Sequence, residues 1–596
     1  MQIIIHKNTQ LTTCQKFFIE KSLELLYLGS IDSYRVRLNN PRTILEELKY
    51  CLEEFELGRI KHFQTIKSKD KGKKALVDDA IKLLQYEETY LRFDSISLNY
   101  INQLLKLIDE YNYKKVISVL EIVLRENDEY LLSVTNGLEN LVATDDHTLA
   151  NLEKIDNALN FLFSELISNG YSKGFLYKLI YGIFVHSLKD GNDFNTHFSD
   201  FKTRILDAES NYDVIFRIDT TQKVYDAITA IPHSILILSD DINEFALTGR
   251  YQAEFESFNI TAANRKFITC SLDARDPLAA LKKARNILSE YLDVINLGLS
   301  GEYLLINQRV LVVGSRPTEK GAFQNNANIL DGKYKVEKDH YVEFTTKLPI
   351  IIQNNNIVKE TKEKIKSAIR YLRLGNQSTE VEHKFINYWI GLEYIFSNYE
   401  SQNTINRIKD HFINAHALAY VKRNTYGMNK FISSLSTYDK TKIVSYNDNN
   451  TEHLKTQVFY QQVTDNLIDD FSLLAYRCMK LAKWFFKAGK PANAADYINA
   501  HKENLEIHFT RIYRLRNEII HDAATDTNNE QIASNLRYYL TFILNELIDF
   551  LVGASDPDTS IEDYFIMNEI KIGNIEFGGF LLTDLLEVNC SIDFIS

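Results

Sequence analysis

Apolar residues recur at helical spacing through the first third of the chain. Residues such as Ile44 and Leu48 are one turn apart, and similar stripes follow at short intervals. No proline interrupts the stretch between Pro41 and Pro232. Because proline breaks helix interiors, its absence agrees with the periodicity. We therefore predict a helical domain over residues 1–205.

The period changes over residues 206–350, where short runs rich in β-branched and aromatic residues predict strands. The predicted strands are Val214–Ile218, Ser234–Leu238, Phe267–Cys270, Tyr303–Ile306, Val310–Val313 and Tyr341–Thr345. A helix is predicted from Asp276 to Ile295, with Asp276 as its cap and Pro277 in its first turn. Residues 321–333 are typical of a loop. This region is expected to form an α+β domain.

Helical spacing returns over residues 359–555 and predicts a bundle of several helices. Two later runs, Tyr564–Ile572 and Ile575–Leu582, resemble strands, so a β-like tail is expected over residues 556–596. The predicted fold class is mainly α, with an α+β middle domain and a C-terminal helical bundle.

Composition narrows the functional classes. Of the 596 residues, 45% are hydrophobic and 12% aromatic, which is typical of a folded globular chain. The net charge of -12 excludes a protein that coats nucleic acid non-specifically, although it allows a local basic patch.

The sequence also bears on location and cofactors. We see no apolar run of about 18 residues and no signal-peptide pattern, so we expect a cytoplasmic protein without a membrane segment. The five cysteines are far apart and include no CxxC pair, so neither a disulfide framework nor a structural zinc site is indicated. No cofactor or metal is expected.

One segment near the end of the bundle combines three polar groups that suit phosphate chemistry. Ile512 and Leu515 belong to the buried stripe of a predicted helix. Asn517 and His521 are one turn apart on another face, and Arg516 is next to Asn517. The segment therefore presents a guanidinium, an amide and an imidazole on one surface.

This trio suits cleavage of a phosphodiester without a metal. An imidazole titrates near neutral pH and can take the proton of a ribose 2′-hydroxyl or protonate the leaving oxygen. A guanidinium matches phosphate oxygens and stabilises the charge that develops at phosphorus, while the amide orients the imidazole or a phosphate oxygen. Because cleavage needs both a base and an acid, two copies of His521 across a dyad would supply both, which predicts a homodimer.

Spacing alone leaves a plainer interpretation open. A chain with 14 histidines is expected to contain on the order of one Arg-x4-His match by chance. In that interpretation, Arg516 and His521 are exposed residues at a helix end, where a histidine favours the C-terminal dipole.

The surrounding residues resemble the HEPN family, and specifically its Apea-like subgroup. Its RNA-cleaving members carry Arg, a polar residue, three further residues and then His, which matches the run from Arg516 to His521. Upstream, the run Phe385–Phe396, with Trp389 and Glu393, is similar to the first long helix of the subgroup. The resemblance covers about residues 360–552.

The resemblance implies a metal-independent endoribonuclease that acts as a dimer, as a toxic effector in prokaryotic antiphage defence (abortive infection). Arg516, Asn517 and His521 are then the catalytic residues, and Glu393 either supports the bundle or orients the site. The regions before residue 350 are expected to sense a phage component or an RNA trigger. The alternative is a non-catalytic HEPN-like scaffold that binds RNA, a nucleotide or a protein.

A group of basic residues in the bundle has two interpretations. Either they belong to an ordinary amphipathic helix, or they form a rim that guides an RNA backbone past neighbouring aromatic rings. The residues are Arg477, Lys480, Lys483, Lys487 and Lys490.

Overall fold

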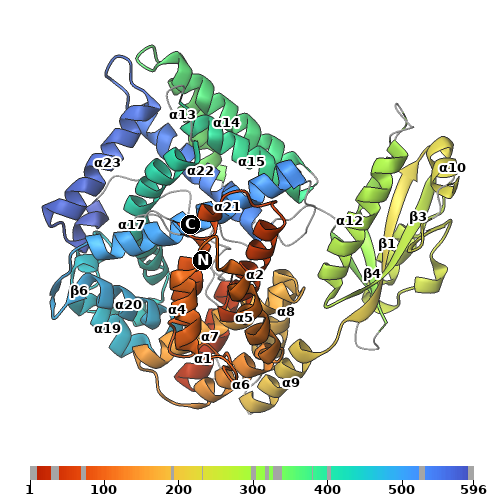
Figure 1. Cartoon of the computed structure of the whole chain (residues 1–596), viewed down its shortest axis with the longest axis horizontal. Helices are drawn as coiled ribbons and strands as arrows, with labels where there is room; N and C mark the ends of the chain where they lie inside the picture. Colours follow the sequence, from red (N-terminus) through yellow and green to blue (C-terminus); the bar gives the residue numbers. More distant parts are fainter. Residues whose placement is uncertain are drawn as a thin grey trace. The chain divides into compact units, whose positions relative to one another are not determined.

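The computed structural model of the chain is predominantly helical, with one small antiparallel sheet (Figure 1). Mainly-α architecture with an α+β middle region is therefore confirmed. The structure describes residues 10–27, 39–68, 75–188, 193–230, 233–262, 264–296, 302, 304–315, 321–325, 338–378, 380–398, 404–522 and 530–587.

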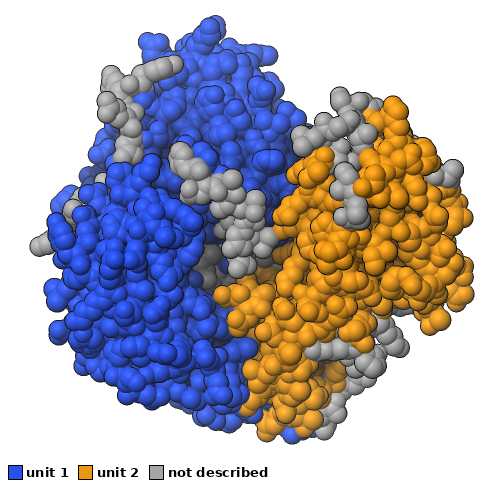
Figure 2. Space-filling model, turned by 45° about the vertical axis from the view of Figure 1, so that its right-hand side comes forward, with its two compact units in different colours: residues 1–165, 188–194, 330–596 blue, residues 166–187, 195–329 orange. Residues whose placement is uncertain are grey.

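The chain divides into two compact units, which Figure 2 colours separately. Unit 1 combines residues 1–165, 188–194 and 330–596, and unit 2 contains residues 166–187 and 195–329. The sequence analysis separated an N-terminal helical region from the C-terminal bundle. In the structure, residues 1–165 belong to unit 1 together with the bundle, because they share interfaces that join residues distant in sequence, whereas residues 166–187 and 195–205 belong to unit 2.

The first region is helical, as the apolar spacing predicts. Its helices are α1 (Thr13–Leu26), α2 (Pro41–Glu56), α3 (Leu76–Leu84), α4 (Leu98–Leu107), α5 (Tyr113–Glu126), α6 (Tyr130–Ala143), α7 (Leu149–Ser168), α8 (Lys173–Tyr181) and α9 (Phe194–Leu206). Helix α2 shows why they begin where they do. The Asn40 side chain accepts hydrogen bonds from the backbone N–H groups of Arg42 and Thr43, and Pro41 occupies the first turn.

Unit 2 contains a five-stranded antiparallel sheet with the strand order β2-β3-β1-β4-β5. The strands are β1 (Ser210–Thr220), β2 (Leu236–Ser239), β3 (Arg265–Ala274), β4 (Leu304–Gly314) and β5 (Ala322–Asn325). Helices α10 (Gln222–Ala230) and α12 (Pro277–Asn296) pack on one face of the sheet, and α11 (Gln252–Phe258) packs on the other. Alternate residues of the central strand serve the two faces, as Val214 and Ile215 illustrate.

The predicted start of α12 is confirmed. One carboxylate oxygen of Asp276 accepts hydrogen bonds from the backbone of Leu278 and Ala279, both at 2.9 Å. The other oxygen accepts one from the backbone of Ser172 at 2.7 Å. Asp276 therefore caps its own helix and also joins it to the turn before α8.

Three predictions for this region need correction. The runs 303–306 and 310–313 are not separate strands, because β4 continues through both from Leu304. The predicted loop 321–333 contains strand β5 in its described part, and residues 326–333 lie outside the described residues. The predicted strand 341–345 was wrong: it lies within helix α13 (Lys338–Gln353), which places the apolar Leu348 and Ile351 against the C-terminal core.

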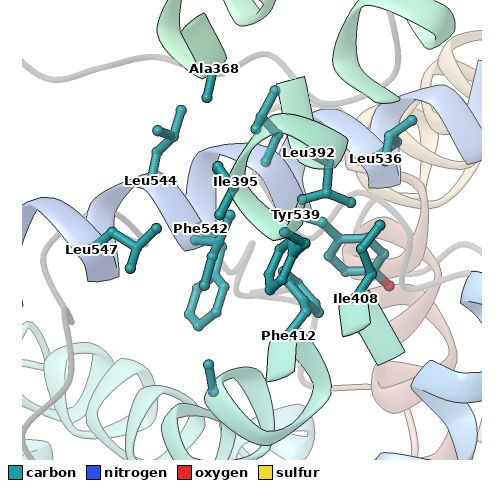
Figure 3. Close-up of a cluster of buried hydrophobic side chains, with 14 of the residues drawn as sticks. Ala368, Leu392, Ile395, Ile408, Phe412, Leu536, Tyr539, Phe542, Leu544 and Leu547 are labelled. Atoms are coloured by element: carbon teal, nitrogen blue, oxygen red, sulfur yellow. The ribbon is translucent and has the colours of Figure 1, made fainter. Parts of the chain in front are cut away.

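The C-terminal region forms the helical bundle that its apolar spacing predicts. Its main helices are α14 (Lys359–Gln377), α15 (Val381–Phe396), α17 (Ile413–Ser433), α19 (Gln457–Leu467), α20 (Ser472–Phe485), α21 (Ala495–Asp522) and α22 (Glu530–Val552). Shorter elements are α16 (Thr404–Arg407), the π-helical turn η6 (Ile408–Phe412) and α18 (Thr437–Thr441). Side chains from α15, η6 and α22 meet in one core, in which Leu392, Phe412 and Phe542 lie close together (Figure 3).

The predicted β-like tail was wrong, because residues 561–578 form helix α23 (Ile561–Gly578). A capping box between Ser560 and Asp563 begins this helix. Its buried residues are distributed between two cores: Phe565 joins that of α15 and α22, and Ile572 joins that of α17 and α20. Gly579, with a φ of 72°, adopts the left-handed conformation that ends the helix.

Helix α1 caps a helix that lies more than 440 residues later in the chain. The Glu20 carboxylate accepts hydrogen bonds from the Ser472 hydroxyl at 2.7 Å and the Leu473 backbone at 2.9 Å. Glu20 thereby satisfies an N–H group at the first turn of α20. Burial raises the pKa of its carboxyl to about 7, although the hydrogen bonds and the nearby cations Lys16 and Arg477 lower it.

We expect Glu20→Gln to change how stability depends on pH. The folded pKa of about 7 lies above the ordinary value of 4.5, so the stability linked to Glu20 is fully present below about pH 4.5 and is lost as pH rises through 7. Between pH 4 and pH 8, the free energy of unfolding of Glu20→Gln should rise by on the order of 3 kcal/mol relative to that of wild type. Urea unfolding across this range measures the difference. Glu121→Gln, at an exposed position, is the control, and parallel profiles for wild type and Glu20→Gln would contradict the expectation.

Candidate active site

Arg516 and Asn517 lie near the end of α21, a helix of 28 residues. The Arg516 Nη1 donates a hydrogen bond to the Asn517 Oδ1 at 3.2 Å. Its Nη2 lies 3.9 Å from the Glu393 Oε1 on α15, and the two side chains are 25% and 31% exposed. The structure thus brings together two of the three predicted catalytic residues and Glu393, the acidic residue noted in the sequence on the upstream helix α15.

The apolar face of α21 holds this arrangement in place. Ile512 and Leu515 are buried in the bundle core, as the sequence analysis predicted. One turn before Asn517, the ring of Tyr513 lies 6.1 Å from that of Trp389 on α15, measured between ring centroids. Packing of α21 against α15 therefore sets the distance between Arg516 and Glu393.

The Arg516 guanidinium keeps donor capacity for a ligand. Its Nε is buried and makes no hydrogen bond to any residue that the structure describes. The contact to Glu393 is longer than an ordinary charge-assisted hydrogen bond. Each of the two terminal nitrogens carries two N–H donors, and the contacts to Asn517 and Glu393 engage one on each, which leaves donors for phosphate oxygens.

His521 belongs to the last turn of α21, so its backbone is helical, as predicted. It is four residues after Asn517 and therefore one turn further along the same helix. The side chain of His521 lies outside what the structure describes, and its distance from Arg516 is not assigned.

Three other histidines of the bundle, the buried His416 and the partly buried His501 and His508, take part in hydrogen-bonded networks. The Nδ1 of His416 lies 3.0 Å from the Nε2 of His501, and its Nε2 lies 3.1 Å from the Tyr538 hydroxyl. The Nδ1 of His508 lies 2.7 Å from the Tyr539 hydroxyl. Burial lowers the pKa of both His501 and His508 to about 3 and that of His416 well below its ordinary value. These rings are neutral at physiological pH and serve structure.

Two further arginines of α21 form a buried ion network with the N-terminal helices. The Arg511 guanidinium binds Glu47 of α2 at 3.0 Å and Asp79 of α3 at 2.6 Å. Arg514 also binds Glu47, and its Nε lies 3.4 Å from Glu518. The two guanidinium groups outweigh the effect of burial and hold the pKa of Glu47 at about 2. The helix that carries Arg516 is thus anchored to α2 and α3.

This network was not predicted from the sequence. Arg511 directly precedes Ile512 in the segment described above, but its acidic partners precede it by more than 430 residues. Glu47 and Asp79 look like ordinary polar positions of amphipathic helices. The sequence offers one signal of the network: arginines alternate with apolar residues on α21. This pattern indicates that the polar side chains of the helix lie among packed helices.

The basic residues of α20, and Lys487 in the short strand β6 (Phe486–Lys487) that follows it, mainly pair with acidic residues. The ion pairs are Arg477–Glu24, Lys480–Asp156, Lys483–Glu153 and Lys487–Asp496. The first three of them join α20 to α1 and α7. These contacts favour an amphipathic helix in an intramolecular interface over a free basic rim for RNA.

The described part of the chain lacks both a metal-ligand cluster and a membrane-spanning helix. It contains no group of three or more His, Cys, Asp or Glu side chains placed to hold a metal ion. None of its helices is both long enough and apolar enough to cross a bilayer.

Comparison of the chain with models of known protein families, with curated proteins and with solved structures gives no significant match in any of the three.

Proposed function

We propose that the protein is a metal-independent endoribonuclease of the HEPN type. The observation that supports the proposal most directly is the partly exposed Arg516 guanidinium, which contacts Asn517 on its own helix and faces Glu393 on α15. His521 follows one turn later on α21. A guanidinium with free donors beside an amide and an imidazole suits the phosphate of an RNA strand.

In the proposed reaction, one imidazole takes the proton of a ribose 2′-hydroxyl, and the 2′-oxygen attacks the adjacent phosphorus. The bond from phosphorus to the 5′-oxygen breaks, and a second imidazole protonates the leaving oxygen. The products are a 2′,3′-cyclic phosphate and a 5′-hydroxyl. Arg516 stabilises the negative charge that develops on the phosphate oxygens. Because each chain supplies one His521, the proposal includes a homodimer in which the two copies face each other.

The biological role that we propose is a toxic effector in antiphage defence, acting on cytoplasmic RNA. Such an enzyme must be inactive until it is needed. Anchoring of α21 to α2 and α3 supports the idea that the N-terminal helices control the site, since they contact the helix that carries it. A phage component or an RNA would act as the trigger.

The proposal is tested by incubating total RNA with purified wild-type protein and with the double variant Arg516→Ala/His521→Ala, in the presence of EDTA. Wild type should cut RNA in EDTA and leave 5′-hydroxyl ends, and the double variant should not. When each form is expressed separately in a phage-challenged host, only the wild-type protein should arrest growth. If the wild-type protein binds RNA but does not cleave it, even under phage challenge, the result would favour the alternative function of a non-catalytic scaffold.

Glu393 is expected to act as a positioning residue for Arg516. Glu393→Gln removes the charge that faces the guanidinium but keeps the shape of the side chain. We expect kcat for RNA cleavage to fall about tenfold with KM nearly unchanged, because the guanidinium is less often directed at the transition state. Glu393→Asp should recover part of the loss. Equal losses in the glutamine and aspartate variants, together with a lower melting temperature, would show a purely structural role.

A further inference from the structure

A pair of stacked aromatic rings lies beside the candidate active site. Tyr394 of α15 stacks on Tyr371 of α14, with ring centroids 5.6 Å apart and planes inclined by 19°. Tyr394 is 42% exposed, and it directly follows Glu393, which faces Arg516. Tyr371 is half-buried, and neither ring belongs to the hydrophobic core of the bundle.

Helix geometry sets the order of these groups across three neighbouring helices. Consecutive residues of a helix point about 100° apart. Glu393 points toward α21, where it meets Arg516, and Tyr394 points toward α14, where it meets Tyr371. Figure 1 shows α14 and α15 packed side by side, in agreement with their extensive contact. The order across the three helices is therefore Tyr371, Tyr394 and Arg516.

The exposed ridge of α14 continues this surface with positive charge, although the whole chain carries a net charge of -12. Arg370, next to Tyr371, is exposed and forms no ion pair with the residues that the structure describes. Arg373 is also exposed and donates a hydrogen bond to the neutral Gln377 at 2.8 Å, which leaves its charge uncompensated. Both guanidinium groups can therefore attract a polyanion.

We propose that Tyr371 and Tyr394 form a stacking platform for an unpaired base of single-stranded RNA, whose backbone runs from Arg370 to Arg516. Exposed aromatic rings bind any base through its face, and nearby arginines bind the backbone phosphates. A base inside a duplex is already stacked on both sides and cannot use the platform. The inference rests on the proposed function, because it names the substrate class of the same site.

The experiment measures binding in the full-length His521→Ala background, where the proposed function predicts no cleavage. The probes are a short labelled single-stranded RNA and the same strand annealed to its complement. Tyr394→Ala should raise Kd for the single strand about tenfold and leave the duplex affinity unchanged. Tyr394→Phe keeps the ring and should restore most of the affinity. Tyr111→Ala, at another exposed tyrosine in the N-terminal region, is the matched control and should bind like its parent.

A second variant keeps the test decisive if Tyr394→Ala lowers the melting temperature. Arg370→Ala changes an exposed side chain, so the fold should be intact. It should weaken single-strand binding and reduce the slope of log Kd against log salt concentration by about 0.7, the value for one phosphate contact.

The two proposals fail in different ways. With an intact His521, Tyr394→Ala should raise KM about tenfold and leave kcat unchanged. If wild type cleaves RNA while Tyr394→Ala and Arg370→Ala show parental Kd and KM, the stacking platform is wrong and the nuclease proposal stands. If wild type binds RNA through Tyr394 but never cleaves it, the nuclease proposal is wrong and the binding surface stands.

Discussion

Replacement of Arg516 by alanine is expected to lower kcat for RNA cleavage by about 10²–10³-fold, the usual cost of removing one preorganised donor at a developing oxyanion. His521→Ala should lower it by about 10²–10⁴-fold, because the reaction then loses its general acid and base. The measurement is the single-turnover rate on a defined RNA, with RNA ends mapped by sequencing.

Matched controls separate chemistry from stability. Arg516 is partly exposed and its guanidinium makes few bonds, so Arg516→Ala should unfold at nearly the wild-type urea concentration. Arg125→Ala and His147→Ala remove the same side-chain types at exposed N-terminal positions and should cleave at the wild-type rate. Arg516→Lys keeps the charge but loses the planar, two-pronged donor geometry of the guanidinium. We therefore expect its cleavage rate to be much closer to that of Arg516→Ala than to that of wild type. A wild-type rate in His521→Ala would refute the assigned chemistry.

Glu47→Ala is expected to lower the free energy of unfolding by about 3–5 kcal/mol, since it leaves two buried guanidinium groups short of a counter-charge. Glu47 binds Arg511 at 3.0 Å and also binds Arg514, and all three side chains are less than one-fifth exposed. This loss is a large share of the 5–15 kcal/mol that is typical of a folded protein. Urea unfolding measures it. Glu53→Ala, which removes an exposed ion pair with Lys49 on the same helix, should cost under about 1 kcal/mol.

Acid should abolish the difference between wild type and Glu47→Ala. The folded pKa of about 2 lies below the ordinary value of 4.5, so the contribution of the Glu47 charge is present above pH 4.5 and is lost as pH falls toward 2. A double-mutant cycle with Arg511→Ala should also show strong coupling, because each single variant already loses the direct ion pair between the two side chains, and the double variant cannot lose it twice. A difference that stays constant from pH 7 to pH 3, or additive effects in the cycle, would contradict the assigned network.

The long apolar periodicities carried most of the predictive information. They placed the helices of the first region and of the bundle, and Asp276 with Pro277 located the start of α12. Short apolar runs were less informative: residues 341–345 and 564–572 are helical, although both are rich in strand-favouring residues. In α23 the side chains that looked like an alternating strand are shared between two cores, so the helix has no single apolar face to detect.

Only the part of the candidate site that lies on a single helix, α21, could be predicted from the sequence. Spacing on α21 placed Asn517 and Arg516 together, and the contact between them is observed. Glu393 was noted through a helix pattern, and its approach to Arg516 depends on how α15 packs against α21. The acidic partners Glu47 and Asp79 and the ring pair of Tyr371 and Tyr394 depend on tertiary packing, which one sequence does not reveal.

The ion pair between Glu47 and Arg511 has a consequence for the chain as it leaves the ribosome. The two residues are 464 positions apart, so at roughly 5–20 residues per second the carboxylate is made about 20–90 s before its counter-ion. During that interval α2 and α3 have uncovered surfaces that chaperones and proteases recognise. A chain whose translation stops early lacks α21, so Glu47 and Asp79 never meet their counter-ion and such a chain is easily degraded.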